Sequence, residues 1–235
     1  AGSGLSTAAL ACANGYVRWS AAEGVSVERV LLSFVPDLAG GLGGKAEWDR
    51  VARGAGEVSA LAKELVEALG GTLQNTPGLL TPGLMGGPIG GSTSGFIAGS
   101  AEAETSEVPP AKARFPRRAA RGVIVVERPT EAEGTEALPI LVALAKTAKR
   151  ADVLVLFEFE QGAAAGVWDL YSALKQPRWG LALQPDEGDG GSPFRENFGR
   201  VKRADFPVGR GFAIESGRVL PIHVAVPEDS SGVLV

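Results

Sequence analysis

The chain has few of the residues that build disulfides, metal sites and nucleophilic triads. Its 235 residues include one cysteine, Cys12, and one histidine, His223. A lone cysteine excludes an internal disulfide, and one cysteine with one histidine excludes a zinc site built from several such ligands. His223 falls in an expected terminal strand with no Gly-x-Ser-x-Gly turn upstream, which gives a hydrolase triad little support. This cysteine usage is typical of a cytosolic compartment.

Long apolar runs and an excess of positive charge are also lacking. No apolar run approaches the roughly 18 to 20 residues of a membrane-spanning helix, and the first residues lack the basic-then-apolar layout of a signal peptide. Lys plus Arg 23 against Asp plus Glu 27 gives a net charge of −4, so no global positive field gathers nucleic acid. The 45% hydrophobic and 21% charged composition predicts a folded chain with a sizeable core, interpreted as a single domain over 1–235.

Glycine is abundant, at 33 residues, and its excess lies in one stretch. Between residues 70 and 106, 22 of 37 residues are Gly, Pro, Ser or Thr, a mixture that does not recover its ordering entropy by burying side chains. We predict a flexible insertion over 70–120. A basic flank lies at and just after its end: Lys112, Arg114, Arg117, Arg118 and Arg121. The flank could contact nucleic acid or an acidic partner, but Phe115 is its one aromatic residue, which favours a solvated surface.

Outside the insertion, short apolar runs alternate with helical spacing. Strands are predicted over 30–35, 122–127, 153–159 and 179–184, and helices around 58–69, 138–145 and 167–174. Segments 211–214 and 219–226 flank a short loop and predict a hairpin. Strands that alternate with helices predict right-handed crossovers and a mainly parallel sheet covered on both faces, which is an α/β fold.

Polar residues follow several of the predicted strands. In open α/β sheets, ligands bind at the carboxyl ends of the strands. This topology would put Glu127, Glu160, Gln161 and Gln184 near one rim. These four are candidate site residues.

The first residues partly match a phosphate-binding loop. That loop ends in Gly-Lys-Ser/Thr and runs into a helix, because backbone N–H groups cradle phosphate, the lysine reaches the terminal phosphates and the hydroxyl holds magnesium. Gly4, Ser6 and Thr7 fit the pattern, while Leu5 occupies the lysine position. The alternative interpretation is a linker, or an ordinary helix N-terminus capped by Ser3 or Ser6.

A nucleotide-hydrolysing site also needs an acid at the end of an apolar strand to orient magnesium, and a second acid to polarise water. Glu127, after the run Val-Ile-Val-Val, meets the first requirement. Arg128 occupies the place of the second. A separate acidic loop, with Asp186, Glu187 and Asp189, could bind a cation but lacks the spacing of a calcium loop and is interpreted as a solvated turn.

Two segments of the C-terminal third resemble one protein family. Residues 178–189 read Arg-Trp-Gly-Leu-Ala-Leu-Gln-Pro-Asp-Glu-Gly-Asp, and residues 206–212 read Phe-Pro-Val-Gly-Arg-Gly-Phe. They resemble the closing segment of FtsK/SpoIIIE-type P-loop ATPase domains, where a "GL-LQPDE-D" stretch precedes a "PPGRG" turn and a final strand. Val208 in the turn and His223 in the final strand depart from that pattern. The order of strands and helices from Gly2 onward also follows the family, so the resemblance covers most of the chain outside the insertion.

Within that family the chain most resembles the C-terminal ATPase domains of type VII secretion motors, the EccC/EssC-like proteins. The resemblance implies a three-layer RecA/FtsK-like P-loop NTPase fold with a C-terminal antiparallel hairpin. It implies that ATP and Mg²⁺ bind at Gly2, Ser3, Gly4, Ser6, Thr7 and Glu127, with Ser6 and Glu127 at the metal and Glu127 in catalysis. Leu5 and Arg128 depart from a working site.

The family also implies partners and a place in the cell. Its motors carry several ATPase domains in tandem on a membrane-anchored chain, and the later domains often have degraded nucleotide sites. The implied partners are neighbouring ATPase domains and secreted proteins, with membrane contact only through regions outside this chain. The implied place is the cytosolic face of a membrane-anchored complex, and a homo-oligomer is an open possibility.

Three functions remain as hypotheses. The first is a type VII secretion motor domain with a degenerate nucleotide site, which recognises substrates or regulates export. Losing the ammonium and the second acid removes electrostatic stabilisation of phosphoryl transfer, but backbone amides could still bind nucleotide. The second is an FtsK-like DNA translocase, which the negative net charge disfavours. The third is a non-catalytic α/β interaction domain.

Overall fold

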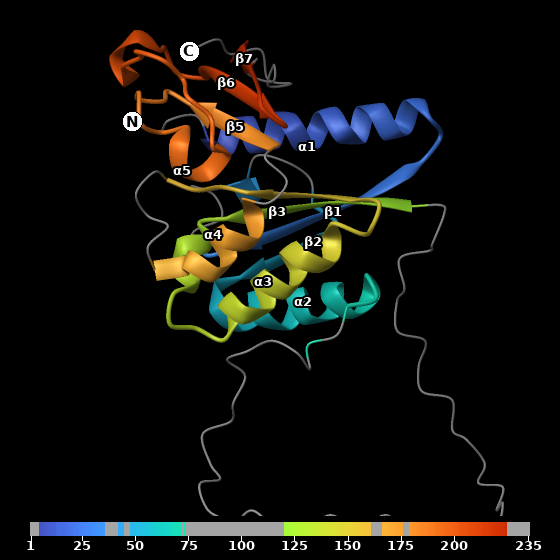
Figure 1. The fold of residues 1–235 in the computed structure, drawn as a ribbon. Coiled ribbons are helices and arrows are strands. Elements are labelled where there is room, and N and C mark those ends of the chain that lie inside the picture. Colours follow the sequence, from blue (N-terminus) through green and yellow to red (C-terminus); the bar gives the residue numbers. More distant parts are fainter. Residues whose placement is uncertain are drawn as a thin grey trace, which may run out of the picture.

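The computed structural model describes residues 5–35, 42–44, 48–71, 73, 120–160, 166–175 and 179–224. It confirms the predicted three-layer α/β fold: a parallel sheet lies between helix α1 (Leu5–Ala22) and helices α2 (Gly54–Ala68) and α3 (Ala137–Ala148) (Figure 1). Residues 74–119, which make up most of the predicted insertion, lie outside the described residues.

The first sheet has four strands, β1 (Ser26–Ser33), β2 (Arg50–Arg53), β3 (Ala120–Glu127) and β4 (Val153–Phe157), in the order β2-β1-β3-β4. All neighbouring pairs are parallel, as predicted. Strand β2 was not predicted, because its two apolar residues, Val51 and Ala52, lie between two arginines and are too few to form an apolar run. Charged residues on a short strand are typical of a sheet edge.

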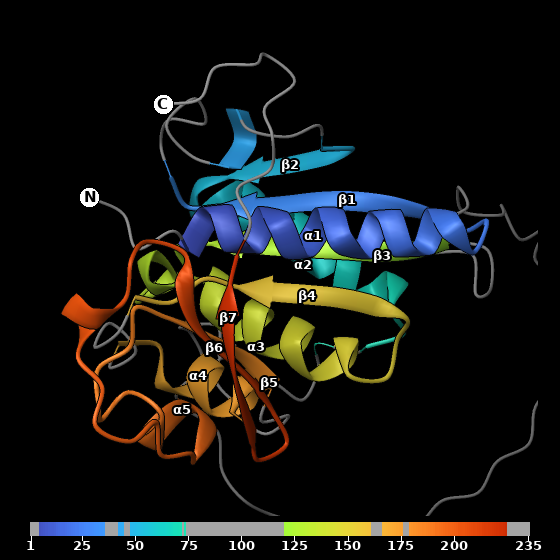
Figure 2. The ribbon, with the colours of Figure 1, turned by 90° about the horizontal axis from the view of Figure 1, so that it is seen from above.

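Side chains of the first sheet alternate between two cores. Ile124 and Val126 of β3 pack with α2 and α3, whereas Val123 and Val125 pack in the core beneath α1. Figure 2 shows α1 running along the sheet above β1 and β3. Successive side chains of a strand point to opposite faces of the sheet, so every second side chain faces α1.

Helix termini follow local chemistry where the sequence predicted it. Gly70 ends α2 with φ +80°, and the N–H of Gly71 donates to the carbonyl of Val66 at 2.8 Å. This is a Schellman arrangement, for which glycine is favoured. At the start of α3 the hydroxyl of Thr135 accepts the N–H of Ala137 at 3.3 Å, although the helix begins one residue later than a Thr135 cap would require.

The C-terminal part forms a second, antiparallel sheet with strand order β5-β6-β7. Its strands are β5 (Trp179–Leu183), β6 (Arg210–Glu215) and β7 (Arg218–His223), with the short helix α5 (Gly191–Phe194) between β5 and β6, and they lie beyond β4 in Figure 2. Helix α4 (Trp168–Leu174) precedes β5 and packs in the core with α2 and α3. The predicted hairpin is confirmed, with Ser216 and Gly217 both at positive φ in a two-residue turn. Gln184 follows a strand of this second sheet, so the expectation that it ends a strand of the parallel sheet was wrong.

Arg121 differs from the predicted solvated flank. Its side chain is 16% exposed, forms ion pairs with Glu23 at 2.7 Å and Asp152 at 3.2 Å, and stacks 4.0 Å from the ring centroid of Trp19. It ties the end of α1 to β3 and to the turn before β4. The other members of the basic flank lie outside the described residues.

Within the described ranges, no helix combines the length and the apolar character needed to cross a membrane.

Candidate functional site

Three polar side chains lie where neighbouring strands of the parallel sheet end. Ser33 ends β1, Glu127 ends β3, and Glu158 directly follows β4. The register pairs Ser33 with Glu127, and the N–H of Glu158 donates to the carbonyl of Val126 at 3.1 Å. Their odd or even positions match those of the neighbouring apolar residues that face α1: Leu31, Val125 and Leu156. All three therefore belong to the layer covered by α1.

Glu127 is enclosed by protein groups. Its side chain is 3% exposed, its Oε2 accepts the hydroxyl of Ser33 at 2.7 Å, and its Oε1 accepts the N–H of Leu42 at 3.0 Å. Leu42 begins the short 3₁₀ turn η1 (Leu42–Gly44) and is itself fully buried. Both oxygens of this carboxylate thus hold parts of the fold together.

Glu158 meets the beginning of α1. Its side chain is 9% exposed, and its Oε2 accepts the hydroxyl of Ser6 at 3.2 Å. Ser6 is the second residue of an 18-residue helix whose own first turn contains no acidic residue. A negative charge is favoured near a helix N-terminus, where backbone N–H groups are not bonded within the helix. Here β4 rather than α1 supplies it.

The structure places the predicted site residues at one edge of the sheet where it describes them. Ser6 and Thr7 lie in the first turn of α1, after Leu5, and Glu127 lies at the end of β3. Gly2, Ser3, Gly4 and Gln161 lie outside the described residues. Ser6 bonds to Glu158, and Glu127 bonds to Ser33 and Leu42.

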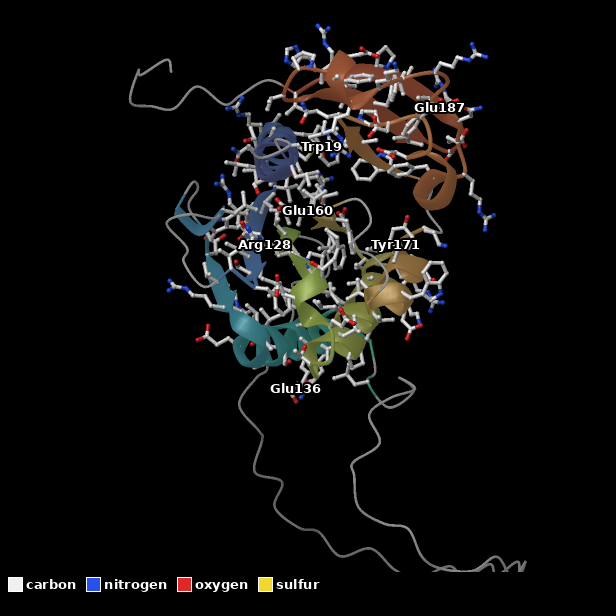
Figure 3. The ribbon with its side chains drawn as sticks, turned by 90° about the vertical axis from the view of Figure 1, so that its left-hand side faces the viewer. Trp19, Arg128, Glu136, Glu160, Tyr171 and Glu187 are labelled. Carbon is white, nitrogen blue, oxygen red and sulfur yellow. The ribbon has the colours of Figure 1, made fainter. Side chains whose placement is uncertain are left out.

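Figure 3 looks onto this edge, with Arg128 and Glu160 at it. Arg128 follows Glu127 in the left-handed conformation, φ 51° and ψ 53°, and leads into the 3₁₀ turn η2 (Pro129–Ala132). Glu160 is exposed. The polar side chain that β4 brings into the site is therefore Glu158, two residues before the one expected.

Glu158 and Ser33 were not predicted from the sequence as site residues. A signal was available for Glu158, since it continues the alternation of Leu154 and Leu156 on the face toward α1. The predicted strand was drawn to Phe159, whereas β4 ends at Phe157. The bond from Leu42 could not be predicted from the sequence, because its donor is a backbone N–H, which every residue except proline has.

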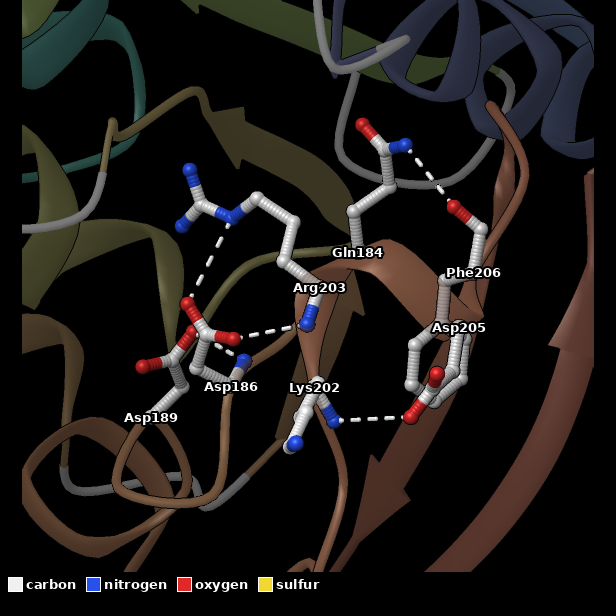
Figure 4. Close-up of polar contacts among 7 residues, drawn as sticks. All are labelled: Gln184, Asp186, Asp189, Lys202, Arg203, Asp205 and Phe206. Carbon is white, nitrogen blue, oxygen red and sulfur yellow. Dashed lines mark hydrogen bonds and ion pairs between the residues drawn. The ribbon is translucent and has the colours of Figure 1, made fainter.

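The acidic loop of the resembling segment is tied to the second sheet (Figure 4). Asp186 accepts the N–H of Arg203 at 2.6 Å, and Asp189 accepts the N–H of Asp186 at 2.7 Å. The side-chain amide of Gln184 donates to the carbonyl of Phe206 at 2.9 Å. The bond between Gln184 and Phe206 joins the two segments that carry the family resemblance, so these two residues have a structural role here.

Other potentially reactive groups in the described part give no second centre. Burial raises the pKa of the Cys12 thiol, which lowers its thiolate fraction and its reactivity. In the described ranges, no three His, Cys, Asp or Glu side chains come together as a metal site.

Of the residues that the resemblance places at ATP and Mg²⁺, the structure describes Ser6, Thr7 and Glu127. The expected magnesium ligands already serve the protein: the hydroxyl of Ser6 is bonded to Glu158, and both oxygens of Glu127 are bonded. Leu5 supplies no ammonium.

The fold of this chain is similar to that of a solved ATPase structure. A solved structure described as "ATPase" superposes with a TM-score of 0.50 at 18% identity, covering 87% of this chain and 64% of its own. The structure of the cytoplasmic domain of the Thermomonospora curvata type VII secretion ATPase EccC superposes with a TM-score of 0.46 at 17% identity, over 87% of this chain and 20% of that chain. This chain therefore spans less than two thirds of either structure. No family model and no curated protein matches the chain.

Proposed function

We propose that this chain is an FtsK/SpoIIIE-like ATPase-family domain of a type VII protein secretion motor with a degenerate nucleotide site. Its role is substrate recognition or regulation of export. The ATPase fold and the two resembling segments support the family. The observation that carries the degenerate site is the enclosure of Glu127 by Ser33 and Leu42.

An acid that orients magnesium in an NTPase presents its oxygens to the metal and its waters. Glu127 instead presents them to a hydroxyl and a backbone N–H from two other parts of the fold. The next residue, Arg128, has a guanidinium that stays protonated and does not accept a proton from water. At the end of β3, Glu127 then does not orient magnesium and Arg128 does not activate water.

The partners of such a domain are proteins. We propose that neighbouring ATPase domains of the same motor and secreted proteins contact the chain, at the cytosolic face of a membrane-anchored complex. The whole of 1–235 would act as one domain, with the 70–120 insertion as a flexible excursion. A DNA translocase is less well supported, because the net charge is −4.

Equilibrium binding of a fluorescent ATP analogue, with and without Mg²⁺, tests the state of the nucleotide site. We expect no saturable Mg²⁺-dependent binding up to about millimolar analogue, a concentration at which even weak sites fill. Thr7→Ala and Glu127→Gln should then change nothing. Saturable Mg²⁺-dependent binding by the wild type that both variants lose would show a working site and overturn the degenerate one.

The regulatory role needs a separate measurement. Phosphate release by a hydrolysing ATPase domain of the same motor is measured with and without this chain, and with a secreted substrate added. A change in rate that saturates with the chain's concentration supports regulation. An unchanged rate, with no substrate binding, would favour the silent α/β interaction domain instead.

A further inference from the structure

The bond between Ser6 and Glu158 joins two residues that are 152 positions apart in the sequence. It connects the first turn of α1 to the end of β4, at the place where the phosphate-binding loop pattern of the sequence would present its hydroxyl. Glu158 is 9% exposed, and the bond from its own N–H to Val126 fixes its backbone against β3. This contact has no part in the proposed function as stated above.

We propose that Glu158 is an autoinhibitory residue whose carboxylate takes the place of phosphate at the start of α1 and keeps this site closed to nucleotides. The inference rests on the proposed function, because it treats this edge as a former nucleotide site. It goes further because it assigns the closure of the nucleotide site to one side chain. The lysine that Leu5 replaces and the missing second acid are then not the cause.

The charge balance of α1 supports this assignment. The helix has 18 residues and no acidic residue in its first turn, so its partial positive charge is not balanced from within the helix. The carboxylate of Glu158 lies within hydrogen-bond distance of that turn, at the hydroxyl of Ser6. A carboxylate and a phosphate are both stabilised by the N–H groups and the dipole at a helix N-terminus, so a carboxylate bound there competes with phosphate.

Burial makes the exclusion effective. Solvent screens repulsion between exposed charges, but a buried carboxylate is screened much less. A second buried carboxylate, Glu127, ends the neighbouring strand at 3% exposed. A polyphosphate that approached this edge would meet the negative charges of Glu158 and Glu127.

The test compares Glu158→Gln with Glu160→Gln. The amide keeps the size of the side chain and still accepts the hydroxyl of Ser6, but removes the charge. Glu160 is exposed and two residues further on, so its variant matches the change in net charge. Binding of the fluorescent ATP analogue and of inorganic pyrophosphate should strengthen about tenfold or more in Glu158→Gln, the equivalent of removing one strong unfavourable contact. Glu160→Gln should match the wild type.

Equal affinities of folded Glu158→Gln and wild type would overturn the inference while leaving the proposed function intact. Binding by the wild type itself would contradict the degenerate site instead, so the two failures are distinguishable. Far-ultraviolet circular dichroism establishes that each variant is folded.

A second variant keeps the test decisive if Glu158→Gln does not fold. Leu5→Lys restores the missing ammonium and leaves Glu158 in place. We expect Leu5→Lys to bind the analogue no better than the wild type, since the carboxylate still occupies the start of α1. A gain of Mg²⁺-dependent binding in Leu5→Lys alone would show that Glu158 does not close the site.

Discussion

Glu127 joins three parts of the fold through one carboxylate: strand β3 that carries it, strand β1 through Ser33, and the turn η1 through Leu42. Hydrogen bonds to a charged group are stronger than neutral ones, and the loss of one partner leaves the others buried and unsatisfied. Ser33 is fully buried, and its oxygen also accepts the N–H of Val35 at 3.1 Å. The stability of this edge therefore depends on a single side chain.

We expect Glu127→Ala to lower the free energy of unfolding by about 2 to 4 kcal/mol, through two lost bonds and a cavity. Glu127→Gln should cost less, because its amide keeps the volume and the hydroxyl of Ser33 can reverse its donor role. Urea unfolding of both variants gives the two values. Glu131→Ala, at an exposed position in η2, is the control and should stay within about 0.5 kcal/mol of the wild type. A Glu127→Ala loss as small as the control's would contradict the enclosed geometry.

At this scale the sequence predicted the carboxylate and not its partners. Glu127 stands out because an acid follows an apolar run, which is a local pattern. Ser33 ends a neighbouring strand and Leu42 lies in the turn η1, so their contacts with Glu127 depend on the register of the sheet and on the position of that turn. Hydrogen bonds between residues distant in sequence leave no local pattern, so the candidate site was predicted only in part.

Elements of the fold differ in how well local patterns define them. The apolar runs in β1, β3 and β4 and the capped helix α2 were predicted within a few residues at their ends. β2 was missed, since Arg50–Arg53 is short and partly charged. The run at Trp179–Leu183 predicted a strand but not its sheet, because periodicity does not tell which neighbour a strand will pair with.

Gly211 shows how closely two elements of the second sheet approach. It pairs with Leu183 of β5, and a Cβ added there would overlap the carbonyl oxygen of Ala182. That oxygen belongs to the backbone, so it does not move aside as a flexible side chain would. Packing against β5 therefore requires glycine at position 211, the second glycine of the Gly-Arg-Gly sequence.

We expect Gly211→Ala to destabilise the protein by about 1 to 3 kcal/mol, the usual cost of forcing atoms into a packed place. Thermal unfolding followed by circular dichroism measures the loss. Gly188→Ala is a matched control, because a Cβ at Gly188 meets no atom within 4 Å. Equal melting temperatures for the two variants would contradict the close approach of β5 and β6.

For the molecule as a whole, charge separates a protein-handling domain from a DNA motor. The net charge is −4, and several cations are held by carboxylates on the surface of the fold. Arg50 pairs with Glu64 at 2.5 Å and Arg121 with Glu23 at 2.7 Å. Binding to duplex DNA requires cations that displace the counterions of several phosphates. The basic flank of the sequence is a cluster of cations that could do this.

We therefore expect the fluorescence anisotropy of a labelled 30-base-pair duplex (about three helical turns) to stay flat up to about 10 µM protein at low salt, where non-specific binding would be strongest. Replacing Lys112, Arg114, Arg117 and Arg118 by glutamine should leave that result unchanged. Binding that weakens steeply as salt rises, and that the four-glutamine variant loses, would mean that the flank contacts phosphates. It would restore the translocase hypothesis, because a motor that moves DNA must first hold its backbone. A flat titration for both proteins would leave protein partners as the cargo or target of this domain.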